Sequence, residues 1–242
     1  MSAGAARVLQ RFNNQSLSAA EHGGGGPSCV ANTNQQHVDG ASRSPSPRSV
    51  RRCEAERFAF SHAKRLVRPG QTSPTPFQSP DGEWLVGVGD SCESFIFHAR
   101  ADGTWERTAT LQDASDAGMA VDFSPSSSAF ATASQDGLLS VYDVRASGRQ
   151  LARMQCRQAT RCVRFSPSCA DLLVCTEHAS RAHVVCTRSY STFQTLHLAG
   201  DLSGAAFTPD GMRLLVGVAD CSIEQWRIDL EARMSFAEGE IS

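Results

Sequence analysis

The stretch "FATASQDGLLSVYDVR" (residues 130–145) alternates apolar and polar residues on both sides of the pair Asp136–Gly137. Short alternating runs are typical of half-buried β-strands, and an Asp-Gly pair between two such runs favours a hairpin turn. The stretch therefore predicts two antiparallel strands that are joined at Asp136–Gly137.

The same pattern recurs at a regular interval along the chain. A Ser-Pro or Thr-Pro pair precedes each alternating run, and its prolines stand 45, 42 and 42 residues apart at Pro80, Pro125, Pro167 and Pro209. A polar turn follows each run, at Asp90, Asp136, Glu177–His178 and Asp220. Each period holds about four short strands and no helical periodicity, which is typical of a β-propeller blade. We predict an all-β propeller within residues 57–242, with blades at about 72–112, 113–156, 157–199 and 200–230.

Residues 1–56 differ in composition from the repeats. They are rich in Gly, Ser and Pro and poor in large apolar residues, so they cannot bury enough surface to offset the entropy of ordering. We predict a disordered tail. Ser44 and Ser46 each precede a proline among arginines, which fits phosphorylation or a weak nuclear-import patch. A solvated linker without a role is the alternative.

Charge and cysteine content limit the classes of function. The 23 Lys and Arg nearly balance the 25 Asp and Glu, so no overall field favours nucleic acid or a membrane. No apolar run is long enough to cross a bilayer. Nine cysteines without a Cys-x-x-Cys pair favour reduced thiols, hence the cytoplasm or nucleus, and no zinc site. We expect no metal and no cofactor.

These repeats resemble the WD-repeat (beta-transducin) family. In that family a turn Asp, a His before the first strand, a Ser or Thr on the second and a Trp on the third form a buried network. Ser134 with Asp136 matches it in one blade and Asp220 with Trp226 in another, so the resemblance gives these residues a structural role. The family's Gly-His pair is absent, and its Trp-Asp pair is replaced by Tyr142–Asp143.

A closer resemblance covers about residues 77–230. The strings "SPDGEWLVGVGDSCESFIF", "RCVRFSPSCADLLVCTEHASRAHVVCTRS" and "DLSGAAFTPDGMRLLVGVAD" are similar to the C-terminal half of plant and fungal WD-repeat proteins that end in a domain of unknown function. The resemblance implies a protein-interaction scaffold. The alternative is a nuclear factor associated with RNA or chromatin, suggested by the basic Ser-Pro tail, although the repeats lack the interleaved aromatic residues of a nucleic-acid site.

The sequence does not predict an enzyme. It lacks a nucleophile elbow, a phosphate-binding loop and a metalloprotease motif. Glu177 and His178 together make at most half of a metal site, so a turn is the better interpretation of this pair.

The family's strand directions place two sets of loops on one rim of the propeller. These loops carry six charged residues that we predict to bind a partner protein: Asp116, Arg157, Arg161, Glu177, Arg181 and Asp201. Solvated loop charges without a partner are the alternative.

Four blades are fewer than most rings of this family contain. We predict an open arc whose exposed edges favour self-association, and a small closed ring is the alternative. The stretch "ERFAFSHA" (residues 56–63) could supply a further outer strand.

Overall fold

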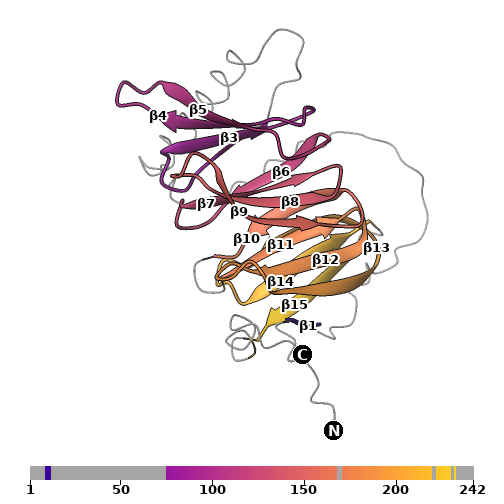
Figure 1. Cartoon of the computed structure of the whole chain (residues 1–242). Coiled ribbons are helices and arrows are strands. Elements are labelled where there is room, and N and C mark those ends of the chain that lie inside the picture. The colour runs from indigo at the N-terminus through magenta and orange to yellow at the C-terminus, as the bar shows by residue number, and fades with distance from the viewer. Residues whose placement is uncertain (1–8, 12–74, 168–170, 220–221, 230–231, 233–242) are drawn as a thin grey trace, which may run out of the picture.

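The computed structural model describes residues 9–11, 75–167, 171–219, 222–229 and 232. Every element labelled along this part of the chain in Figure 1 is a β-strand, and the strands form a row of antiparallel sheets. The structure therefore confirms the predicted all-β fold and a partial β-propeller. Among the described residues there is no helix that is long and apolar enough to cross a membrane.

The first two sheets contain four strands each, in chain order. The first consists of β2 (Thr75–Gln78), β3 (Trp84–Val88), β4 (Ser94–Ala99) and β5 (Trp105–Leu111). The second consists of β6 (Gly118–Phe123), β7 (Ala129–Ser134), β8 (Leu138–Asp143) and β9 (Arg149–Gln155). In the second sheet Phe130 lies opposite Tyr142 and Ala133 opposite Leu139, as the hairpin at Asp136–Gly137 requires.

The last two units share one seven-stranded sheet. Its strands are β10 (Thr160–Phe165), β11 (Leu172–Glu177), β12 (Ala179–Cys186), β13 (Phe193–Phe207), β14 (Arg213–Val218), β15 (Ile223–Ile228) and β1 (Leu9–Arg11). The first half of β13 pairs with β12 and its second half pairs with β14. The long strand β13 is therefore the outer strand of the third unit and the inner strand of the fourth.

The described sheets form an open row. The inner strands contact one another in the order β2, β6, β10 and β13, while the first sheet and the β15–β1 edge lie at opposite ends (Figure 1). Neighbouring sheets are joined by polar contacts: the Asp122 carboxylate accepts the Phe165 N–H at 2.7 Å, and the Thr160 hydroxyl donates to the Ser134 carbonyl at 2.9 Å.

A hydroxyl between the first two strands of each unit explains the recurring Ser-Pro and Thr-Pro pairs. Its oxygen accepts the backbone N–H that opens the next strand, at 2.9 to 3.1 Å. The four hydroxyls belong to Ser79, Ser124, Ser166 and Thr208. Side-chain hydrogen bonds of this kind stabilise turns, so each pair defines the first hairpin of its unit.

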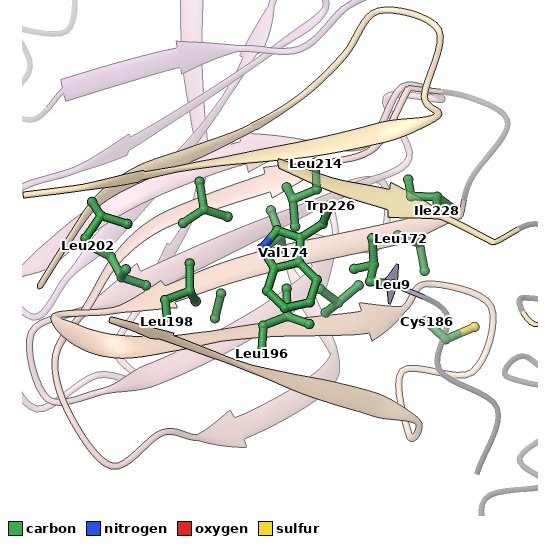
Figure 2. Packing of buried hydrophobic residues seen from close by; sticks show 14 residues of the cluster. Leu9, Leu172, Val174, Cys186, Leu196, Leu198, Leu202, Leu214, Trp226 and Ile228 are labelled. Carbon is green, nitrogen blue, oxygen red and sulfur yellow. The ribbon is translucent and has the colours of Figure 1, made fainter. Parts of the chain in front are cut away.

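The prediction of a disordered tail over residues 1–56 is wrong for residues 9–11. These residues form β1, which pairs with β15 through Leu9 opposite Ile228 and Arg11 opposite Trp226. Leu9 is fully buried in the largest apolar cluster, which Figure 2 shows around Trp226, Leu214 and Ile228. The average composition of 56 residues does not reveal a three-residue strand, because only one large apolar side chain of that strand packs against the last sheet. The other residues of 1–56, including Ser44 and Ser46, and the stretch 56–63 lie outside the described residues.

Candidate functional site

The loops that precede the inner strands meet the second hairpin turns on one rim. We call this surface the loop rim, and define it as residues 113–117, 135–137, 155–161, 177–181, 199–203 and 219. Backbone hydrogen bonds join its parts in series: Gln135 N–H to Ala117 C=O, Cys156 N–H to Gly137 C=O, His178 N–H to Ala159 C=O, Leu202 N–H to His178 C=O and Ala219 N–H to Asp201 C=O. The rim is therefore a continuous hydrogen-bonded surface across three units.

Asp136 holds the loop before β6 against its own hairpin turn. Its carboxylate accepts the Ser134 hydroxyl, the Leu138 N–H at 3.1 Å, and the N–H and hydroxyl of Ser115, both at 2.7 Å. Burial disfavours the ionised carboxylate, but these hydrogen bonds outweigh burial and lower the pKa of Asp136 to about 2. Asp136 is thus ionised at neutral pH, and Ser134 and Asp136 form part of the network that the family resemblance implied.

Gly137 lets the segment after β9 approach this turn. Its φ is +81°, and a Cβ there would lie 2.7 Å from the Gln158 carbonyl oxygen and 3.0 Å from that of Cys156. Only glycine combines this backbone angle with so close an approach.

The other half of the expected network differs. Trp226 is buried in the apolar cluster, and its indole Nε1 has no hydrogen-bond partner in the described part of the chain. Asp220 lies outside the described residues. Tyr142, at the family's Trp position, stacks on Phe130 with ring centroids 5.1 Å apart and donates its hydroxyl to Asp113 at 2.6 Å. Burial and this hydrogen bond raise the pKa of Tyr142 to about 12.

Four of the six charged residues predicted to bind a partner are exposed on the loop rim: Asp116, Arg157, Arg161 and Asp201. Asp201 has its Oδ1 3.9 Å from His178 Nδ1. Arg181 is half-buried, with its Nη1 4.0 Å from Glu177 Oε2.

The prediction for Glu177 as a rim charge is wrong, because its side chain is buried beneath the rim. Glu177 is the last residue of β11, and the residues around it cover the carboxylate. Its Oε1 accepts the Arg157 N–H at 3.2 Å and lies 2.8 Å from His183 Nε2. Glu177 and His178 do lie at a turn, between β11 and β12, as the sequence predicted; His178 faces Asp201, whereas Glu177 faces His183.

A buried polar cluster surrounds this carboxylate. Cys156, directly after β9, Glu177 and His183 from β12 bring one ligand-type atom each to within 4.8 Å of one another. His183 Nδ1 lies 3.0 Å from the Thr195 hydroxyl. Cys156 and His183 stand 27 residues apart in the sequence, so no short motif marks them. The signal available was a single histidine inside the apolar run "AHVVC".

Contacts within the cluster shift the pKa values of its thiols and its imidazole. A hydrogen bond from the Cys175 thiol lowers the pKa of Cys156, burial raises it and His183 lowers it further, so that it falls to about 6. The same thiol pair, together with burial, raises the pKa of Cys175. Burial lowers the pKa of His183, but its hydrogen bonds to Cys156 and Glu177 outweigh burial and raise it. The contact between Cys156 and His183 therefore lowers the pKa of the thiol and raises the pKa of the imidazole.

Comparison with known proteins shows that two segments of the chain are similar to family models. Residues 105–143 match the family model described as "WD domain, G-beta repeat", and residues 158–197 match an "Uncharacterised protein domain (DUF2415)". An uncharacterized protein of Schizosaccharomyces pombe is 28% identical over 176 residues, which are 65% of this chain and 50% of that protein. An uncharacterized protein of Saccharomyces cerevisiae is 36% identical over 88 residues, which are 34% of this chain and 12% of that protein. The chain thus spans half of the first relative and a smaller part of the second.

Proposed function

Because the chain carries a WD repeat within a partial β-propeller, we propose that it is a non-enzymatic scaffold that binds a partner protein through the loop rim. WD repeats generally serve as protein-interaction scaffolds, and the repeat at residues 105–143 supports this role. The partner is a protein of the cytoplasm or nucleus, where reduced cysteines persist.

One observation carries the choice of the rim. Arg157 and Arg161 are exposed and four residues apart, and neither side chain forms an ion pair with the described residues. The backbone on which they stand is tied to the β11–β12 turn by the His178 to Ala159 hydrogen bond at 2.8 Å. Unpaired charges on a rigid loop steer a partner and set its orientation at little entropic cost. An acidic surface is the complement that these two arginines favour.

The buried cluster does not argue for catalysis. Cys156 and Glu177 are buried beneath the rim, where a macromolecular substrate cannot reach a nucleophile.

The test is co-precipitation with the full chain followed by mass spectrometry, comparing the wild type with the double variant Arg157→Glu/Arg161→Glu. The control is Arg145→Glu/Arg153→Glu, which makes the same charge change at exposed positions of the second unit outside the loop rim. Both variants should have nearly the wild-type melting temperature, because exposed substitutions usually change the free energy of unfolding by no more than about 0.5 kcal/mol. We leave Arg181 unchanged because a glutamate there would face the buried Glu177 carboxylate.

We expect the rim variant alone to lose partners. A rim variant that keeps every partner refutes the proposed face. In that case the groove of about 250 Å³ between the second and third units, which Ser126, Phe165 and Tyr190 help to line, is the next face to test.

A further inference from the structure

The cluster of Cys156, Glu177 and His183 lies outside the proposed binding function and has the composition of a metal site. The three side chains come from two neighbouring units: Cys156 follows the last strand of the second sheet, and the other two lie on β11 and β12. A thiolate, a carboxylate and an imidazole are all ligands of zinc. We propose that Cys156, Glu177 and His183 bind a zinc ion that joins these two units of the propeller.

The separations are close to those of a tetrahedral site. Zinc bonds of about 2.0 to 2.3 Å place neighbouring ligand atoms roughly 3.3 to 3.6 Å apart. The three donor atoms lie within 4.8 Å of one another, and His183 Nε2 lies 2.8 Å from Glu177 Oε1. A zinc ion between His183 Nε2 and Glu177 Oε1 would lengthen their separation by about half an ångström. It would also draw Cys156 Sγ closer to both atoms. Small side-chain rotations achieve these movements.

A buried carboxylate oxygen points to a missing cation. Glu177 is 1% exposed, and its Oε2 has no hydrogen-bond partner in the described part of the chain. Arg181 Nη1 lies 4.0 Å from this Oε2. Buried carboxylate oxygens without partners are costly, and a divalent ion beside Glu177 removes that cost.

The surroundings favour zinc over harder cations. Calcium and magnesium prefer sites made of oxygen atoms, whereas a thiolate selects softer metals. Cys175 is fully buried and its thiol is hydrogen-bonded to that of Cys156. Cys175 thus supports the thiolate of Cys156, and the three ligands leave the fourth position of a tetrahedral zinc site to a further group.

His183 is oriented as metal-binding histidines are. Its Nδ1 lies 3.0 Å from the Thr195 hydroxyl, which leaves Nε2 toward Glu177 and Cys156. A partner on the second ring nitrogen sets the tautomer and raises affinity, and removing such a partner typically costs 10- to 100-fold. Thr195 is therefore a positioning residue for the site.

The test begins with the wild-type full chain under reducing conditions. We expect one zinc ion per chain after purification without chelator, measured by inductively coupled plasma mass spectrometry. Adding Co²⁺ to the zinc-free protein should produce a thiolate-to-cobalt charge-transfer band in the near ultraviolet together with intense visible bands of tetrahedral cobalt. Zinc should displace the cobalt and raise the melting temperature.

Variants then identify the ligands. Cys156→Ser should abolish the charge-transfer contribution of its thiolate and weaken zinc binding by at least about 100-fold, and Thr195→Ala should weaken it by about 10- to 100-fold. Cys162→Ser is the matched control, because Cys162 is also buried but its thiol contacts the Ala205 carbonyl at 3.6 Å. If Cys156→Ser fails to fold, His183→Gln and the wild-type cobalt spectrum still decide the question.

Two results would overturn the inference. One is a reduced wild-type chain that holds no zinc and gives no cobalt–thiolate band, which would leave the cluster as a hydrogen-bonded network. The other is a cobalt spectrum that survives in Cys156→Ser and His183→Gln unchanged, which would assign the metal to other cysteines. Neither result affects the rim variants, so this inference and the proposed function fail separately.

Discussion

Replacing Leu9 with alanine tests whether β1 completes the last sheet. Leu9 is 0% exposed and packs in the cluster that includes Leu214, Trp226 and Ile228 (Figure 2). The change removes three carbon atoms, and at about 0.8 kcal/mol per buried methylene the transfer term is about 2.4 kcal/mol. A cavity that relaxes only in part adds to this loss, so we expect about 3 kcal/mol, within the range of buried Leu→Ala changes.

The measurement is urea unfolding of the full chain, followed by fluorescence and circular dichroism. Leu151→Ala is the control, because it makes the same chemical change on β9 at a side chain that is 39% exposed. We expect this control to change the free energy of unfolding by less than about 1 kcal/mol. The slope of the transition should stay constant for both variants if each changes stability alone.

Gln194 provides a second perturbation of the same contact. Its side-chain Oε1 accepts the Leu9 N–H at 3.2 Å, and its Nε2 donates to the Leu9 carbonyl at 3.3 Å. Gln194→Ala should therefore cost about 1 kcal/mol and should add less than its full cost in the Leu9→Ala background, since both changes weaken one contact. Equal stability of Leu9→Ala and Leu151→Ala would refute the assignment of residues 9–11 to the last sheet.

Two further predictions concern the Asp136–Gly137 turn. Because the folded pKa of Asp136 is about 2, below the ordinary value of 3.8, its ionised form stabilises the fold above about pH 4, and this contribution is lost as the pH falls toward 2. A pKa difference of about 1.8 corresponds to about 2.4 kcal/mol, and solvent screening at this partly exposed site reduces the value to about 1 kcal/mol. Asp136→Asn should thus cost about 1 kcal/mol in urea unfolding at pH 7 and less at pH 3, with Asp116→Asn as the control. A cost that is the same at both pH values would contradict this reasoning. Gly137→Ala should destabilise the fold by about 2 kcal/mol or more, because the new Cβ clashes with the Gln158 carbonyl and the positive φ strains the backbone. Gly103 has a similar φ of +80° but open space where a Cβ would lie, so Gly103→Ala should show the backbone strain alone. Equal costs for the two glycine changes would show that the segment after β9 does not pack against the turn.

The repeating hairpins could be predicted from the sequence because their information is local. Asp136–Gly137 and the flanking alternation specify one turn and two strands within 16 residues. The Ser-Pro and Thr-Pro pairs mark the other hairpin of each unit through a hydroxyl that bonds only five or six residues away. Such signals depend on neighbouring residues, so they persist wherever the unit is placed.

The candidate site was predicted only in part, because burial is a property of the packed units. Arg157 and Asp201 lie on the rim, as the order of the strands implied. Glu177 is an acidic residue like Asp201 and ends β11 at a hairpin turn, yet its side chain points beneath the rim to His183. Nothing in the local sequence separates an exposed turn carboxylate from a buried one.

The sequence by itself determined the strands, their turns and the four-stranded period, since each depends on contacts between residues close in the chain. Only the tertiary structure decided which strand completes the last sheet and which side chains meet between the units. Leu9 pairs with Ile228 across the length of the chain, and Cys156 meets Glu177 and His183 across a sheet boundary. Both outcomes depend on which edge and which buried space the packed units leave open, and no short window of sequence contains that geometry.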